Sequence, residues 1–304
     1  MSLISPVALL RRQFYMPWAR IPEGRMLELP GRGGSTYVTD TPGPAPESPT
    51  VVLLHALGCT GLLTWYPAIE PLSRRYRVVT LDLRWHGQGI QGEKFSLYDC
   101  ADDVAALIDV LELEDVIVVG YSMGSIVAQR VWRQHPDKVQ GLVLCATTDR
   151  FRLSPQERFF FAGMEATMLG ALGLSHSRTA LRAARAAAEA VLEPTDIQDW
   201  ALREFRSTSP WAVGQALAAL GRHHSRPWLG KINVPTAVVV GTKDRVIPSD
   251  RQVSLARAIP GATIHDFAGG HASCVLGTEV FVPCLLEAVN TVNARRRDLG
   301  RETA

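Results

Sequence analysis

The sequence predicts an α/β fold, with a mostly parallel sheet of eight strands flanked by helices and an inserted all-helical cap. Three observations support this fold class. Short apolar runs rich in β-branched residues recur along the chain, as expected for strands that are buried on both faces. Apolar residues at helical spacing lie between the earlier runs. From about residue 154 to residue 228 the alternation stops, and only helical patterns occur.

The strands are expected at eight places in the chain. The first two, at residues 25–30 and 35–40, are joined by a glycine-rich segment, which is typical of a hairpin. The other six are the apolar runs at residues 50–55, 76–82, 115–121, 139–146, 235–241 and 262–267. Segment 97–111 carries apolar residues at helical spacing, so we expect it to cover one face of the sheet.

The composition is that of an ordinary globular protein. Of the 304 residues, 46% are hydrophobic and 20% are charged, and a chain of this length can bury a large core. A formal net charge of +2, with no dense block of Lys and Arg, argues against a nucleic-acid partner. The five cysteines are scattered and lack CxxC spacing, so they indicate neither a disulfide framework nor a zinc site and favour a reducing cytoplasm.

We divide the chain into four segments. Residues 1–24 form an N-terminal arm, apolar in part, which is too short to span a bilayer and lacks the features of a signal peptide. We expect the arm to pack on the body, with a weak peripheral membrane contact as the alternative. Residues 25–150 form the first part of the core, residues 151–230 the helical cap, and residues 231–304 the second part of the core.

A serine stands between two glycines where the run at 115–121 ends. The stretch GYSMG, residues 120–124, matches the pattern G-x-S-x-G and lies after an expected strand and before an expected helix. In this context the motif predicts a strained turn that holds Ser122 above the carboxyl ends of the strands, where open α/β sheets bind ligands. The alternative is a serine that merely caps a helix.

A serine hydroxyl becomes a nucleophile when a base takes its proton and a third group orients that base. Both groups follow in the sequence. Asp244 lies in the loop after the expected strand at 235–241, and His271 lies in a glycine-rich loop after the last expected strand. Asp149, just after the strand at 139–146, is an alternative position for the acid.

Four motifs carry a resemblance to a known family: LLHALG at 53–58, DLRWHGQG at 82–89, GYSMG, and GTKDRVIP paired with GGHAS. Through them the sequence resembles the α/β-hydrolase superfamily over nearly its whole length, in the branch with one helical cap after the sixth strand. The resemblance implies that Ser122 is the nucleophile, His271 the general base and acid, and Asp244 its orienting carboxylate. The backbone N–H groups of Leu57 and Met123 would form the oxyanion hole.

Two positions depart from the family pattern. Ala56 stands where a glycine usually follows the histidine of the first loop, and it fits only if the backbone there avoids a positive φ. Trp85 also replaces a glycine, and we expect it to border the substrate together with Tyr121. The neighbouring His86 is expected to support its loop rather than to act as a base.

The other histidines do not suggest a site. His265 should point away from Ser122, because it alternates with apolar neighbours inside the last strand. His223 and His224 have no carboxylate or cysteine at metal-ligand spacing. We therefore expect no metal, and no organic cofactor either, because the sequence lacks a G-x-G-x-x-G motif and a P-loop.

One apolar stripe in the cap is a candidate for substrate contact. Phe160, Met164 and Met168 recur every four residues, so they share one face of a helix. The stripe either packs the cap onto the core or lines a cleft for an apolar acyl group of moderate size.

The sequence thus predicts a cofactor-free serine hydrolase that cleaves a carboxylic ester, lactone or related acyl substrate through an acyl-enzyme. The resemblance extends to enol-lactonases, esterases, cofactor-free perhydrolases and C–C bond hydrolases, and the sequence does not separate these classes. Two other possibilities stay open: a lyase or oxygenase in which Ser122 only donates a hydrogen bond, and a binding protein with negligible turnover. The expected partner is a small-molecule substrate, and the sequence indicates no oligomeric state.

Overall fold

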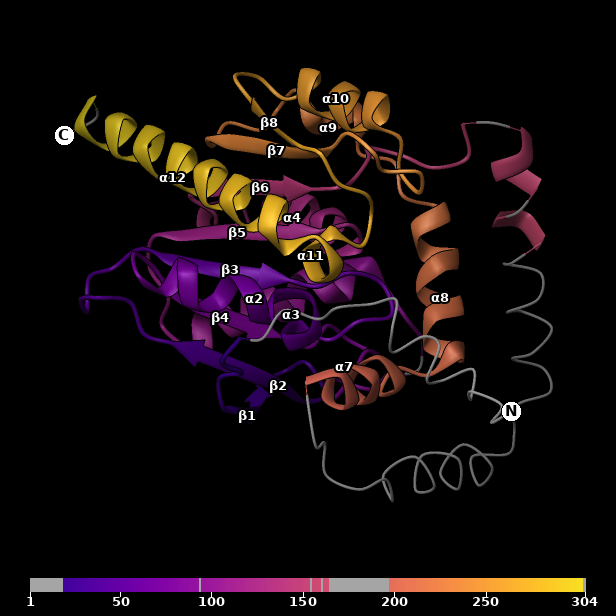
Figure 1. Cartoon of the computed structure of the whole chain (residues 1–304), viewed down its shortest axis with the longest axis horizontal. Helices are drawn as coiled ribbons and strands as arrows, with labels where there is room; N and C mark the ends of the chain where they lie inside the picture. Colours follow the sequence, from indigo (N-terminus) through magenta and orange to yellow (C-terminus); the bar gives the residue numbers. More distant parts are fainter. Residues whose placement is uncertain (1–18, 93, 154, 160, 164–196, 303–304) are drawn as a thin grey trace, which may run out of the picture.

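The computed structural model describes residues 19–92, 94–153, 155–159, 161–163 and 197–302. The chain forms an eight-stranded sheet in the order β1-β2-β4-β3-β5-β6-β7-β8, which confirms the predicted fold class (Figure 1). β1 and β2 pair in antiparallel fashion with their neighbours, and all later pairings are parallel. The strands are β1 (Gly24–Leu29), β2 (Gly34–Thr41), β3 (Thr50–Leu54), β4 (Arg77–Leu81), β5 (Val116–Tyr121), β6 (Gly141–Cys145), β7 (Thr236–Gly241) and β8 (Thr263–Phe267).

Helices cover both faces of this sheet. Buried side chains of α3, α4 and α10 form a cluster on one face, and those of α2 and α12 form a second cluster on the other. The helices are α2 (Gly61–Ser73), α3 (Leu97–Val110), α4 (Met123–Gln134), α7 (Ile197–Arg206), α8 (Pro210–Gly221), α9 (Arg226–Leu229), α10 (Ser249–Arg257), α11 (Ser273–Leu276) and α12 (Thr278–Glu302).

The central strands are mainly apolar because both of their faces are covered. In β3, Val52 and Leu54 belong to the cluster of α3 and α4, whereas Val51 and Leu53 belong to the cluster of α2 and α12. Successive side chains of a strand point to opposite faces, so a strand between two helical layers shows no alternation of polar and apolar residues.

A helical insertion lies between β6 and β7. Figure 1 shows α7 and α8 at the end of the sheet toward which the parallel strands point. Ala216 and Leu220 of α8 join the core cluster, and Trp200 of α7 lies edge-on against Tyr66 of α2, with ring centroids 5.1 Å apart. The insertion therefore covers the carboxyl ends of the strands. Phe160, Met164 and Met168 of the expected cap stripe lie outside the described residues, so their role stays a prediction.

Most of the expected N-terminal arm, residues 1–18, also lies outside the described residues, so its packing stays a prediction. Within that described part, no helix combines the length and the apolar character needed to cross a membrane. All five cysteines are free thiols.

Candidate active site

Ser122 occupies a strained turn between β5 and α4. Its backbone has φ 52° and ψ −112°, in a region that non-glycine residues rarely adopt. Both flanking glycines are required by close backbone contacts. A Cβ on Gly120 would lie 2.3 Å from the nitrogen of Ser125, and a Cβ on Gly124 would lie 2.1 Å from the carbonyl oxygen of Leu54. The G-x-S-x-G spacing follows from this packing.

Ser125 fixes the same turn, a role that the sequence did not reveal. Its hydroxyl donates to the carbonyl of Gly120 at 2.6 Å and accepts from the N–H of Cys145 at 2.9 Å. The N–H of Ser122 in turn donates to the carbonyl of Cys145 at 2.9 Å. The strained residue is thus tied to β6 on one side and to its own helix on the other.

Ser122, His271 and Asp244 form a continuous hydrogen-bonded chain. The Nε2 atom of His271 lies 2.9 Å from the Oγ atom of Ser122, and its Nδ1 atom lies 2.7 Å from Oδ2 of Asp244. A carboxylate only accepts hydrogen bonds, so Nδ1 carries the proton and Nε2 is left to accept from the serine hydroxyl. These are the contacts that a nucleophile, a base and an orienting acid require.

The carboxylate of Asp244 is fully buried but well supplied with donors. Its Oδ1 atom accepts from the N–H groups of Val246 and Ile247, at 2.8 and 2.9 Å. Its Oδ2 atom accepts from His271 and, at 3.2 Å, from the side-chain amide of Gln252. A buried charge is stable when its lone pairs are satisfied in this way.

Gln252 of α10 is a second residue that the sequence did not single out. Its side chain is completely buried, and besides contacting Asp244 it donates to the carbonyl of Ile247 at 2.7 Å and accepts from the N–H of Gly241 at 3.1 Å. One side chain thus joins the end of β7 to the loop that carries the acid. A glutamine in an amphipathic helix resembles a surface residue, so the pattern gave no signal.

The sequence model of the alpha/beta hydrolase fold family matches residues 49–278, a span that contains Ser122, Asp244 and His271. The chain belongs to this family. The α/β hydrolase resembles the pimeloyl-[acyl-carrier protein] methyl ester esterase of Chromobacterium violaceum, with 28% identity over 264 residues, covering 81% of this chain and 96% of that protein. The putative carbamate hydrolase RutD of Serratia proteamaculans is also 28% identical, covering 83% of this chain and 95% of its own.

Solved structures agree on the fold. The enol-lactonase from Burkholderia xenovorans LB400 superposes with a TM-score of 0.67 at 24% identity, covering 88% of this chain and 100% of that chain. A thermophilic esterase from Thermogutta terrifontis superposes with a TM-score of 0.66 at 23% identity, covering 89% of this chain and 99% of that chain.

The candidate oxyanion donors of this α/β hydrolase are backbone groups of Leu57 and Met123. Met123 is the first residue of α4, where helical N–H groups have no partner within the helix. Ala56 does not have a positive φ, so the alanine replaces the usual glycine without backbone strain. Its N–H donates to the hydroxyl of Thr64 at 3.2 Å, which fixes the loop ahead of Leu57.

Tyr121 was expected to border the substrate, but its side chain is completely buried. Its hydroxyl donates to the carbonyl oxygen of His271 at 3.0 Å, and its ring packs edge-on against Trp65 and Phe281. This placement puts Tyr121 behind the histidine, among the side chains of α2 and α12. The expectation that Tyr121 contacts the substrate is therefore wrong, because its side chain is buried.

Two further histidines lie in the loops around the site. His55 and His86 are buried, with ring centroids 5.1 Å apart. Burial lowers the pKa of His55 to about 3 and that of His86 to about 4, so both rings are neutral near pH 7. Nε2 of His55 accepts from the N–H of Leu83 at 2.8 Å, which joins the loop after β3 to the loop after β4.

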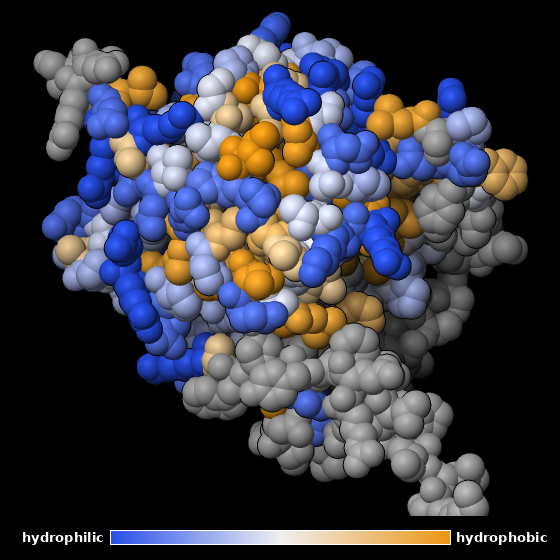
Figure 2. Space-filling model, turned by 45° about the horizontal axis from the view of Figure 1, so that its top comes forward, coloured by the Kyte–Doolittle hydropathy of each residue, from blue (hydrophilic) through white to orange (hydrophobic). Residues whose placement is uncertain are grey.

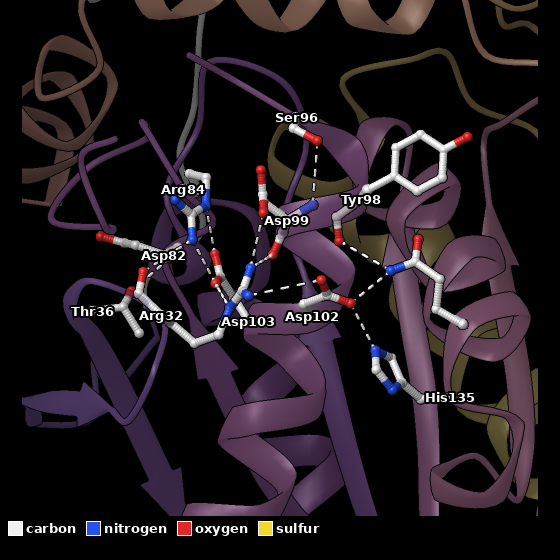
Figure 3. A network of polar contacts seen from close by, with 11 residues as sticks. Arg32, Thr36, Asp82, Arg84, Ser96, Tyr98, Asp99, Asp102, Asp103 and His135 are labelled. Carbon is white, nitrogen blue, oxygen red and sulfur yellow. Dashed lines mark hydrogen bonds and ion pairs between the residues drawn. The ribbon is translucent and has the colours of Figure 1, made fainter. Parts of the chain in front are cut away.

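The loop that carries Trp85 is anchored by an ion network (Figure 3). The guanidinium of Arg84 makes two hydrogen bonds to Asp103 of α3, at 2.8 and 2.7 Å. Arg32, from the β1–β2 turn, contacts Asp103 at 2.8 Å and Asp99 at 3.1 Å. Trp85 follows with a φ of 68° and a partly buried ring that packs on the core. The network thus anchors the loop on α3 directly ahead of Trp85, and the expected contact of Trp85 with substrate stays a prediction.

The alternative acid, Asp149, lies elsewhere. Its carboxylate is 3.8 Å from Nε of Arg150 and 3.7 Å from Arg226, and its backbone carbonyl accepts from the N–H of Ser225. Nδ1 of His271 is occupied by Asp244, so the geometry favours Asp244 as the orienting group.

His265 and His223 have surroundings of their own, outside the hydrogen-bonded chain of Ser122, His271 and Asp244. His265 lies 3.8 Å from Glu287, and His223 is buried with no hydrogen-bond partner for either ring nitrogen in the described part of the chain. No group of three or more metal-binding side chains occurs among the described residues.

Proposed function

We propose that this α/β hydrolase cleaves a carboxylic ester or lactone through an acyl-enzyme on Ser122. The observation that carries the proposal is the chain of contacts from Ser122 through His271 to Asp244, at 2.9 and 2.7 Å. The buried position of Asp244 and the strained turn at Ser122 support it, because both keep the groups in reactive geometry before substrate arrives.

In the first half of the reaction, Oγ of Ser122 attacks the acyl carbonyl carbon while Nε2 of His271 takes the hydroxyl proton. The N–H groups of Leu57 and Met123 stabilise the oxyanion that forms, an effect that typically amounts to ~10²–10³ in rate for one donor. His271 then gives its proton to the leaving alkoxide, the alcohol departs, and the acyl group remains on Ser122.

In the second half, a water molecule takes the place of the alcohol. His271 removes a proton from this water, which attacks the acyl carbonyl, and Ser122 leaves as its proton is restored by the same imidazole. The buried carboxylate of Asp244 stabilises the imidazolium that forms in each half. The products are a carboxylic acid and an alcohol, joined in one molecule when the substrate is a lactone.

An ester or lactone is the bond type that the relatives favour, because esterases and an enol-lactonase are among the proteins to which this chain is similar. A panel of short acyl esters, lactones and C–C substrates tests the bond type. We expect turnover of esters or lactones, lost in Ser122→Ala and kept in Ser73→Ala, which removes a hydroxyl that donates to the carbonyl of Glu70. Turnover of C–C substrates alone, or an active Ser122→Ala, would contradict the proposal.

A further inference from the structure

A second hollow lies at the opposite end of the sheet from Ser122. Its walls come from residues 44–49 before β3, residues 74–76 before β4, and the C-terminal half of α12, and its volume is about 610 Å³. These segments stand at the amino-terminal edge of the parallel strands, whereas Ser122 follows the carboxyl end of β5 (Figure 1). The hollow is therefore separate from the candidate active site, and its volume lies within the range of small-molecule sites.

The lining of this hollow is strongly basic. Among the described residues, those that line it include three arginines, Arg74, Arg75 and Arg297, and one acidic residue, Glu47. Figure 2 shows strongly hydrophilic residues along the side of the molecule where α12 ends. Three positive charges that line one hollow repel one another unless counter-charges reach them, so the hollow attracts anions.

Arg75 and Arg297 differ from the neighbouring arginines in the chain in having no carboxylate partner among the described residues. Arg77 pairs with Asp40, at 2.7 Å, and Arg296 pairs with Asp115, at 2.6 Å. No carboxylate among the described residues pairs with Arg75 or Arg297, and Arg74 has only an exposed contact with Glu70 at 3.3 Å. The two guanidinium forks that border the hollow are thus available to an incoming anion.

The rest of the lining supplies neutral donors and an apolar surface. Tyr76 is buried, and its hydroxyl donates to Oδ1 of Asn290 at 2.7 Å, an arrangement that fixes the orientation of this side-chain amide. Asn293 lies one turn further along α12. Pro44 and Pro49, from the segment before β3, add a rigid apolar surface to the lining. The hollow thus combines charged forks, amides and a surface for an uncharged body.

We propose that this hollow binds the phosphate group of a small organic phosphate. Guanidinium forks match phosphate oxygens in bidentate fashion, and a phosphate dianion balances the two unpaired arginines. The apolar wall would contact the organic part of the ligand. Binding joins three segments that are distant in sequence, namely the β2–β3 loop, the end of α2, and α12.

The test is calorimetric titration at constant ionic strength with adenosine monophosphate, inorganic phosphate and succinate. The informative variant is Arg75→Gln combined with Arg297→Gln, and the charge-matched control is Arg133→Gln combined with Arg257→Gln. All four side chains are exposed, so both double variants should fold. We expect saturable binding of adenosine monophosphate that weakens at least ~10-fold in the first variant and is unchanged in the control.

The three probes also identify the source of the phosphate. Tighter binding of adenosine monophosphate than of inorganic phosphate supports an organic ligand that uses the apolar wall. Equal binding of the two, lost together in Arg75→Gln with Arg297→Gln, would retain the phosphate site but overturn the organic part of the proposal. Absence of saturable binding, equal binding of succinate, or equal losses in both double variants would overturn the phosphate site itself.

Discussion

The hydroxyl of Tyr121 holds the backbone of His271: it donates to the histidine carbonyl oxygen at 3.0 Å. Tyr121 immediately precedes Ser122 in the chain, so one residue ties the strand that presents the serine to the loop that presents the histidine. The two loops come from β5 and β8, which are not neighbours in the sheet. The contact therefore fixes a relative position that the sheet alone would not.

Tyr121→Phe should reduce kcat by ~10-fold and leave KM nearly unchanged, because the imidazole loses its fixed position while the surface open to substrate is unaltered. The free energy of unfolding should fall by about 1 kcal/mol, since a buried carbonyl loses its donor. Steady-state kinetics and denaturant unfolding measure these quantities. Tyr98→Phe, which removes an exposed hydroxyl, is the control. Unaltered kcat in Tyr121→Phe would show that the contact is only structural.

Asp244→Asn should lower kcat by ~10⁴ while the protein stays folded, because an amide can no longer hold the tautomer that leaves Nε2 as an acceptor. Asp149→Asn should change kcat by no more than a few-fold, since its carboxylate faces Arg150 and Arg226 instead of the imidazole. Ester turnover and thermal unfolding of both variants measure this. A severe loss in Asp149→Asn with little effect in Asp244→Asn would move the orienting acid to the end of β6.

Gly124→Ala should prevent folding or lower the free energy of unfolding by more than about 4 kcal/mol, because the new methyl would lie 2.1 Å from a backbone oxygen that cannot move aside. Gly230→Ala is the matched control, since nothing lies within 4 Å of its added Cβ and its φ is −64°. Its stability should be unchanged or raised by about 0.4–1 kcal/mol. Chemical denaturation compares the two, and a folded, stable Gly124→Ala would contradict the account of the turn.

Asp82 gives the protein a pH dependence near neutrality. Burial raises the pKa of this carboxyl to about 7, although N–H groups of Gly61 and Gln88 donate to it. The unfolded chain ionises near the ordinary pKa of 3.8, so folding disfavours the charged form. The contribution of Asp82 to the free energy of unfolding should therefore decrease as pH rises from about 4 to about 7, by at most about 1.4 kcal/mol per pH unit, and then level off.

Asp82→Asn isolates this contribution, because other buried groups also titrate in this range. We expect the difference in unfolding free energy between wild type and Asp82→Asn to shift in favour of the variant as pH rises to 7, as measured by urea unfolding at several pH values. A difference that does not vary with pH would show that Asp82 has an ordinary pKa in the folded state.

The sequence predicted the strands and the loops at their carboxyl ends, because burial in the sheet leaves a recognisable apolar pattern in the sequence. The buried parallel strands are mainly apolar, and the loops after β5, β7 and β8 carry Ser122, Asp244 and His271 because the carboxyl ends of parallel strands meet at one edge. The sequence did not reveal the polar residues whose roles depend only on tertiary contacts. Ser125 and Gln252 lie in amphipathic helices, where neither residue type departs from the usual pattern.

The case of Tyr121 is different, because the sequence did contain the signal. In β5, Ile117 and Val119 belong to the cluster of α2 and α12. Strand alternation puts Tyr121 on the same face, among the buried side chains of α2 and α12. Its position next to the serine suggested a substrate contact, whereas its parity in the strand indicates the buried position that the structure has.

The most direct test of the central claim is covalent labelling of Ser122 with a fluorophosphonate, followed by mass spectrometry of the intact protein and its peptides. This reagent reacts with a serine hydroxyl that a neighbouring base activates. We predict one added phosphonyl group per chain, located on Ser122, absent in Ser122→Ala and greatly slowed in His271→Ala. An unlabelled wild-type protein, or a label on another residue that persists in Ser122→Ala, would contradict the acyl-enzyme mechanism.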